Sequence, residues 1–269
     1  MAGNIMKNGV NQLLLILFLV FPLSTQAASY KSVIAFGDSL TDNGNIRRFT
    51  DGAIWVETLA SSFEASLYDF AHSGATTGYD NPAAGLNYSG LQWQLENYSA
   101  PADDALFTLW IGANDLEQGR SFETAAENIA TALQSLYADG ARDILVGNLP
   151  NIGATPRFID YGLETATLAT QWTMGFNVQL ATVLSVFEQS YPDVNLYRLD
   201  VYELFENFTP QTSEWRELFW TDGFHPSSVG HQLIADTALT HLEAVPAPAS
   251  ILLIGSGIIG LALLRRKLA

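Results

Sequence analysis

The stretch of sequence that decides the fold is KSVIAFGDSLTDNG, residues 31–44. Its first six residues read as an apolar β-strand, and Gly37 permits a tight exit from that strand. Ser39 then stands at the start of the next loop. In an α/β sheet this is the rim where ligands bind, and a helical turn after Ser39 would direct its N–H groups at a developing negative charge.

The rest of the chain repeats the same alternation of strand and helix patterns. The predicted strands are residues 31–36, 66–71, 105–111, 143–149 and 195–200. The middle three in chain order are near-continuous apolar runs, as in parallel strands that are covered on both faces. Five β-then-α repeats predict the α/β fold class, with a three-layer, doubly wound, five-stranded parallel sheet in a single domain.

Two helical patterns between the strands are well marked. Ser121 is placed to cap a helix that ends before Gly140. A longer apolar stripe has spacings of three and four residues, and we expect it to face the core rather than a ligand. It consists of Leu168, Trp172, Phe176, Leu180, Val183, Phe187 and Tyr191.

The composition excludes several classes of protein. Hydrophobic residues make up 48% of the 269 residues and charged residues only 15%, a balance that excludes intrinsic disorder. Residues 29–244 hold all 28 Asp and Glu but only 8 of the 12 Lys and Arg, a formal charge of −20. A body this acidic repels phosphate backbones, so we expect no nucleic-acid partner. The absence of cysteine excludes disulfide scaffolds, thiolate metal sites and a Cys nucleophile.

A serine hydroxyl needs a neighbouring base to act as a nucleophile, and the sequence offers four histidines. His225 has Asp222 three residues before it, a spacing that lets the carboxylate hold Nδ1–H while Nε2 faces Ser39. Pro226 would then begin the last helix.

The other three histidines, His72, His231 and His241, lack such a neighbour. His231 stands one helical turn beyond Ser227, and we expect it to be packed or hydrogen-bonded within a helix. His72 either lines the cleft beside Ser73 or has a structural role.

The oxyanion that forms on nucleophilic attack needs hydrogen-bond donors at fixed positions, and two more strand ends offer them. Gly74 follows strand 66–71 and can bring its N–H close to a substrate. Asn114 follows strand 105–111, and its side-chain amide can donate a second bond. A loop glycine and an Asn helix cap are the alternatives. Against them, four separate strand-end segments offer the parts of one acyl-transfer site.

At this point the chain resembles a GDSL-type serine hydrolase of the SGNH superfamily, of the branch that contains secreted lipases and haemolysin-like phospholipases. The resemblance runs from about Val33 to Ala235. The blocks that carry it are FGDSLTDNGN, FAHSGATT, Gly90-Leu91-Gln92, WIGANDL, GNLPNIG and FWTDGFHPSSVGHQLIAD. The resemblance implies a catalytic triad of Ser39, Asp222 and His225. It also implies an oxyanion hole of Ser39, Gly74 and Asn114, with no metal and no cofactor.

The function implied by this resemblance is that of a serine esterase or lipase, which cleaves a lipid or short-chain carboxylic ester through an acyl-enzyme. Two alternatives stay open: an O-acetyl esterase that acts on envelope polysaccharide, and a non-catalytic surface or matrix protein on the same fold. The intact set of Ser, Gly, Asn, Asp and His argues against the second. We expect segments 79–89 and 207–218, the latter with Trp215, to wall the pocket.

Both ends of the chain read as sorting signals. Residues 1–28 combine a basic start, the apolar run LLLILFLVFPL and small residues, the pattern of a cleaved secretory signal peptide. Residues 245–269 resemble the PEP-CTERM sorting signal, with a Pro-x-Pro motif, a Gly-rich apolar stretch and a basic end. This segment would contact the membrane and an exosortase-type processing enzyme. We therefore expect residues 29–244 to form an exported hydrolase domain, in the periplasm, outer envelope or medium, and at least transiently membrane-anchored.

Overall fold

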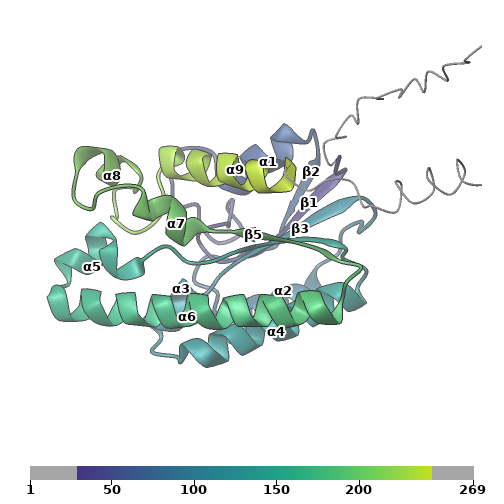
Figure 1. The fold of residues 1–269 in the computed structure, drawn as a ribbon, viewed down its shortest axis with the longest axis horizontal. Helices are drawn as coiled ribbons and strands as arrows, with labels where there is room; N and C mark the ends of the chain where they lie inside the picture. The colour runs from purple at the N-terminus through teal and green to yellow at the C-terminus, as the bar shows by residue number, and fades with distance from the viewer. Residues whose placement is uncertain (1–28, 244–269) are drawn as a thin grey trace, which may run out of the picture. The chain divides into compact units, whose positions relative to one another are not determined.

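A five-stranded, wholly parallel sheet lies between two layers of helices in the computed structural model, which describes residues 29–243 (Figure 1). The strands are β1 (Ser32–Gly37), β2 (Ser66–Asp69), β3 (Ala105–Trp110), β4 (Asp143–Gly147) and β5 (Asn195–Leu199). Their order across the sheet is β2-β1-β3-β4-β5, so β2 and β3 lie on opposite sides of β1. Such a reversal of direction marks the place where α/β sheets bind ligands, outside the carboxyl ends of the strands. The predicted fold class is confirmed.

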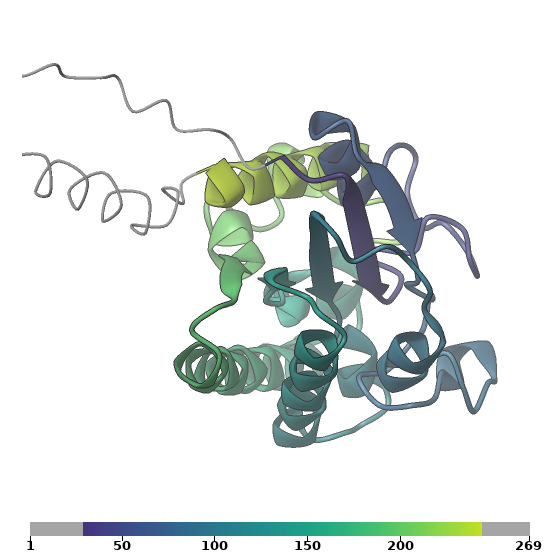
Figure 2. The same cartoon turned by 90° about the vertical axis from the view of Figure 1, so that its right-hand side faces the viewer.

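Helices cover both faces of the sheet. They are α1 (Trp55–Ser62), α2 (Leu91–Asn97), α3 (Ala113–Glu117), α4 (Phe122–Ala138), α5 (Pro156–Asp160), α6 (Leu163–Ser190), α7 (Val201–Glu206), α8 (Ser213–Glu217) and α9 (Ser228–Glu243), with the short 3-10 turns η1 (Pro82–Ala84) and η2 (Ile152–Ala154). Helices α1 and α9 pack together on one face, and α2, α4 and α6 on the other (Figure 2).

The strand at the edge of the sheet differs from expectation. Residues 66–71 were predicted to be a strand covered on both faces, but β2 ends at Asp69, Ser66 is exposed and the other three residues are only half-buried. The reason is its position, because an edge strand has a neighbouring strand on one side only. The strands covered on both faces are the three inner ones. Every residue of β1 and β3 is buried, and so is every residue of β4 except Asp143, which is half-buried.

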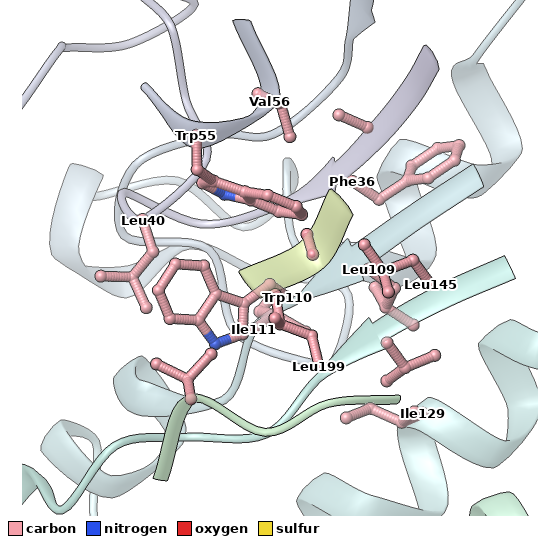
Figure 3. Close-up of a cluster of buried hydrophobic side chains, with 14 of the residues drawn as sticks. Phe36, Leu40, Trp55, Val56, Leu109, Trp110, Ile111, Ile129, Leu145 and Leu199 are labelled. Atoms are coloured by element: carbon pink, nitrogen blue, oxygen red, sulfur yellow. The ribbon is translucent and has the colours of Figure 1, made fainter. Parts of the chain in front are cut away.

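Two tryptophans connect the core to the turn that follows β1 (Figure 3). Trp55 and Trp110 are fully buried, with their rings edge to face at 5.9 Å between centroids. Trp55 Nε1 donates to Thr41 Oγ1 at 3.2 Å. A side chain at Gly147 would meet the Trp110 ring at 2.6 Å, so this position needs glycine. Close packing of this kind fixes the backbone on either side of Ser39.

The two marked helical patterns have different outcomes. Helix α4 is confirmed: Ser121 Oγ accepts from Thr124 N at 3.2 Å, and Gly140 follows the helix with φ +97°. For α6, six members of the predicted stripe face the core: Phe176, Leu180 and Phe187 are buried, and Trp172, Val183 and Tyr191 pack against the core. The prediction that Leu168 faces the core is wrong, since this residue is 59% exposed. The buried face of α6 consists of Ala169, Thr173, Phe176, Leu180, Leu184 and Phe187.

The predicted signal peptide (residues 1–28) and sorting signal (residues 245–269) lie outside the described residues. Within residues 29–243, no helix has both the length and the apolar character that a membrane crossing requires.

Candidate active site

Ser39 lies in the turn after β1, with its side chain against His225. The turn is closed by the N–H groups of Thr41 and Asp42, which donate to the Asp38 carbonyl at 3.0 and 2.9 Å. Ser39 Oγ and His225 Nε2 are 2.8 Å apart, and both residues are more than 90% buried. This separation is a hydrogen-bond distance, short enough for a proton to pass between the two atoms.

Asp222 lies on the other side of the imidazole. Its Oδ2 is 2.5 Å from His225 Nδ1, while Oδ1 accepts from the N–H groups of Phe224 and His225 at 2.9 and 3.0 Å. Burial alone would raise the pKa of the Asp222 carboxyl. The hydrogen bond and charge of His225, together with the two N–H groups, outweigh burial and lower this pKa to about 2. The carboxylate is therefore ionised at neutral pH and can fix the imidazole with its proton on Nδ1.

The segment around His225 is a loop rather than the start of a helix. The prediction that Pro226 begins the last helix is wrong, because α9 begins at Ser228 and Pro226 forms an isolated bridge with Phe219. The His225 ring is held instead by Phe49, whose ring is stacked on it at 4.4 Å between centroids. The orientation of the imidazole thus comes from a neighbouring loop as well as from Asp222.

Ser39 and Gly74, each with a backbone N–H group, both line the cavity of the site. Gly74 has φ +87°, and a side chain there would approach Asn81 Oδ1 to 2.5 Å and Ala83 Cβ to 2.8 Å. Glycine is therefore required at this position. Among the described residues, neither Gly74 N nor Ser39 N has a protein acceptor. Buried N–H groups without partners are rare in folded proteins, and these two are free to bind an anionic oxygen.

Asn114 is the second residue of α3, which follows β3, and it lines the same cavity as Ser39, as expected. Its Nδ2 donates to Asp38 Oδ2 at 3.2 Å and to the Ala75 carbonyl at 3.0 Å. Burial raises the pKa of the Asp38 carboxyl to about 7, against the lowering effect of the Leu40 and Gly112 N–H groups. Both hydrogens of the Asn114 amide have partners, so donation to a substrate requires the exchange of one of them.

Asp42 fixes the rim of the site, a role that the sequence analysis did not identify. Its carboxylate accepts from five backbone N–H groups at 2.6–3.2 Å. Four belong to the loop that leads to Phe49, namely Gly44, Asn45, Ile46 and Arg47, and the fifth is that of Ser73. One carboxylate thereby joins the loop after β1 to the segment that carries Gly74.

A cavity of about 260 Å³ opens beside Ser39 and His225. It is lined by Ser39, Ile46, Arg47, Phe49, Ser73, Gly74, Ala83, Ala84, Asn114, Glu117, Arg157, Phe224 and His225. Segment 79–89 contributes Ala83 and Ala84, as expected. Segment 207–218 contributes nothing, which corrects the prediction: Trp215 is 2% exposed and packs against Phe219. A larger depression of about 800 Å³ between α2 and α4 contains none of the predicted site residues.

Two of the remaining histidines have structural contacts. His231 Nδ1 accepts from Trp55 N at 3.4 Å, and burial lowers the pKa of His231 to about 3, so it stays neutral. His72 Nδ1 is 2.8 Å from the Phe70 carbonyl, and its ring lies edge-on to Trp93. His72 does not line the cavity, although Ser73 does.

Several residues of the cavity wall were not found by sequence reasoning, among them Phe49, Glu117 and Arg157. Arg157 lies 65 residues before Asp222, and its Nη2 donates to Asp222 Oδ2 at 3.0 Å. No motif or spacing indicates such a contact. Within residues 29–243, no group of three or more His, Asp and Glu side chains is arranged to hold a metal ion.

Comparison with protein families identifies the family to which the chain belongs. The profile of the GDSL-like lipase/acylhydrolase family matches residues 33–238, so the chain belongs to this family. The profile of the PEP-CTERM protein-sorting motif matches residues 244–267.

Individual relatives are distant. The chain is 30% identical over 169 residues to a phosphatidylcholine-sterol acyltransferase of Aeromonas hydrophila, a match that covers 50% of either chain. It is 25% identical over 269 residues to an acetylesterase of Thermothelomyces thermophilus, covering 80% of this chain and 89% of the other. The chain spans about half the length of the first curated relatives that it matches.

A solved structure supports the fold. A lipolytic G-D-S-L family member from Veillonella parvula superposes with a TM-score of 0.56 at 20% identity, covering 80% of this chain and 99% of that one. At this identity the likeness concerns the fold alone.

Proposed function

We propose that this protein is a serine hydrolase of carboxylic esters, with Ser39 as nucleophile, His225 as general base and Asp222 as the group that orients the imidazole. The observation that carries the proposal is the unbroken line of contacts from Ser39 Oγ through the His225 ring to Asp222 Oδ2, at 2.8 and 2.5 Å. It stands at the carboxyl end of β1 in a member of an ester-hydrolysing family.

The reaction follows from this geometry. His225 Nε2 takes the proton of Ser39 Oγ as the oxygen attacks the ester carbonyl, and the imidazolium is stabilised by Asp222. His225 then protonates the leaving alcohol as the acyl-enzyme forms on Ser39. In the second half, His225 removes a proton from water, which attacks the acyl carbonyl. The bond between the acyl group and Ser39 Oγ then breaks, His225 returns the proton to Ser39 Oγ, and the acid is released.

The negative oxygen of the intermediate would be bound by Ser39 N–H, Gly74 N–H and the Asn114 amide. The two backbone N–H groups have no other acceptor among residues 29–243, which supports this role. The Asn114 amide would exchange its longer contact, 3.2 Å to Asp38 Oδ2, for the oxyanion. Each such donor typically stabilises the transition state by about 3 kcal/mol.

Two observations favour a short acyl group as substrate. The cavity of about 260 Å³ lies below the roughly 300–1,000 Å³ that accommodate whole drug-sized ligands. The match to the acetylesterase also extends over 89% of that protein, against 50% for the lipid acyltransferase. An O-acetyl ester of an envelope polysaccharide is therefore the second candidate, beside lipid esters.

We also propose that the hydrolase domain, residues 29–244, is exported by a signal peptide at residues 1–28. The PEP-CTERM motif at residues 244–267 supports export and sorting at a membrane. An exosortase-type enzyme would be the processing partner of that segment.

A hydrolysis panel tests the activity and the substrate class together. It compares p-nitrophenyl esters of increasing acyl length, phospholipid vesicles and acetylated sugars, with wild-type protein and with Ser39→Ala. We expect kcat for the preferred ester to fall by about 10³-fold or more in Ser39→Ala, with an unchanged circular dichroism spectrum. Turnover within about tenfold of wild type would rule out Ser39 as nucleophile. Hydrolysis of no ester by wild type would favour a non-catalytic role.

A further inference from the structure

Arg157, the second residue of α5, contacts the acid of the site directly. Its Nη2 donates to Asp222 Oδ2 at 3.0 Å, and the same oxygen is 2.5 Å from His225 Nδ1. The two bonds place the guanidinium nitrogen within about 5.5 Å of the imidazole, a separation at which charges interact appreciably. One carboxylate oxygen thus joins a permanent cation to the ring that must accept a proton.

The guanidinium is held in place from several sides. Its Nη1 is 3.5 Å from Glu117 Oε1, and its Cζ lies 4.5 Å from the centre of the Phe224 ring. The Arg157 backbone N–H donates to the Gly223 carbonyl at 2.9 Å, which joins α5 to the loop that carries Asp222. The side chain is 23% exposed. Its position is therefore fixed by packing and by charge.

We propose that Arg157 is a positioning residue for the hydrolysis proposed above: it holds the Asp222 carboxylate against His225, and its charge opposes protonation of the imidazole in the free enzyme. Glu117, which pairs with Nη1 of the same guanidinium, partly compensates the positive charge of Arg157. The inference rests on the proposed function, because it assigns a role within the same reaction.

Other charged and titratable groups also surround His225. Arg47 lies over the Phe49 ring that is stacked on the imidazole. Asp38 precedes Ser39 in the chain and accepts from Asn114, and His231 lies on α9 and stays neutral. Among the described residues, Arg157 is the one side chain that shares the Oδ2 atom of Asp222 with His225. Its removal therefore changes the charge closest to the Asp222–His225 pair without removing either partner.

The charges predict opposite effects for two neutral substitutions. Only the neutral imidazole accepts the Ser39 proton, so the midpoint of the acid limb of kcat/KM reports protonation of the site in the free enzyme. Arg157→Gln removes a cation and makes protonation easier, which moves this midpoint to higher pH. Glu117→Gln leaves the Arg157 charge less compensated, which moves it to lower pH. A merely structural role would not produce shifts of opposite sign.

The experiment measures kcat/KM for p-nitrophenyl acetate from about pH 5 to about pH 9. We expect the midpoint to rise by about one pH unit in Arg157→Gln and to fall by about half a unit in Glu117→Gln. Arg157→Lys keeps the charge and should retain most of the wild-type midpoint. Arg142→Gln is the matched control, since Arg142 also pairs with an acid (Asp193, 3.1 Å) and covers a ring (Tyr137, 4.3 Å), but does not line the cavity.

Midpoints that move in the same direction in Arg157→Gln and Glu117→Gln, or that stay within error of wild type, would overturn the inference. If Arg157→Gln does not fold, the other two variants still test the inference. It then requires a lower midpoint of the acid limb in Glu117→Gln and a midpoint close to wild type in Arg157→Lys. Failure of the proposed function looks different, because wild type and Arg142→Gln would then hydrolyse no ester at all.

Discussion

Asp222 shows how a single side chain is specified by its surroundings. Its four contacts come from two backbone N–H groups, one imidazole nitrogen and one guanidinium, so both carboxylate oxygens are fully engaged. The hydrogen bond and charge of His225, together with the two backbone N–H groups, keep the pKa of the carboxyl near 2 despite burial. An uncharged amide at this position would remove the negative charge and would place a hydrogen-bond donor where one carboxylate oxygen now accepts.

Asp222→Asn therefore tests the orienting role of Asp222. The amide nitrogen can donate but not accept, so it favours the tautomer with its proton on Nε2, which cannot receive the Ser39 proton. We expect kcat to fall by about 10³- to 10⁴-fold, measured with the preferred ester of the panel. Asp193→Asn, at an exposed acid paired with Arg142, is the control. Full activity in Asp222→Asn with none in His225→Ala would indicate a Ser–His dyad instead.

The elements of the fold explain which site residues were predictable from sequence. Ser39, Gly74 and Asn114 each follow a strand, and the carboxyl ends of parallel strands meet at one edge of the sheet. Apolar runs locate β1 and β3, because every residue of these two strands is buried. The edge position of β2 was not predictable, because it depends on strand order, which no single segment encodes.

Other features depend on contacts between distant segments. Arg157 and Asp222 are 65 residues apart, and the stacking of Phe49 on His225 joins two different loops. The Leu168 error has another cause: spacings of three and four residues fit two adjacent stripes on α6 equally well. The true stripe, through Ala169, is decided by how the helix packs on its neighbours.

Helix α9 carries a buried histidine whose effect on stability can be measured. His231 has a pKa of about 3 in the folded protein, whereas an unfolded histidine titrates near 6.5. Below about pH 6.5, His231 therefore binds a proton in the unfolded state but not in the folded state. The free energy of unfolding decreases as the pH falls below this value. His231→Gln keeps an acceptor for Trp55 N–H but removes the titration.

We expect this substitution to change the pH dependence of stability. Between pH 7 and pH 5, the free energy of unfolding of wild type relative to His231→Gln should fall by about 2 kcal/mol, measured by urea denaturation. The comparison cancels the pH dependence of the other groups, including Asp38 and Asp69, whose pKa values are both raised to about 7 by burial. An unchanged difference between the two proteins would mean that His231 is not buried as described.

At the scale of the whole molecule, an acidic hydrolase domain is followed by a sorting motif. All 28 Asp and Glu lie in residues 29–244, and the family profile accounts for residues 33–238 of the chain. The three cations of the C-terminal end follow the Gly-rich apolar stretch. The PEP-CTERM motif at residues 244–267 supports the proposal that the domain is exported and sorted at a membrane.

Processing of the two ends is the corresponding prediction. In the native host, we expect the mature protein to begin near Ala28 and, after sorting, to lack the residues that follow about Ala247. Intact-mass analysis of membrane and medium fractions measures both ends at once. A full-length C-terminus in every fraction would indicate a permanent anchor, and an intact N-terminus in the cytosol would contradict export.

In the proposed hydrolysis, Ser39 forms a covalent acyl-enzyme. The most direct test of this step is reaction with a fluorophosphonate, in which Ser39 Oγ attacks phosphorus and fluoride leaves, followed by peptide mapping by mass spectrometry. We expect one phosphonyl group per chain, on the peptide that contains Ser39, and a loss of esterase activity in proportion to labelling. Labelling of a different residue, or full activity in completely labelled protein, would contradict this role of Ser39.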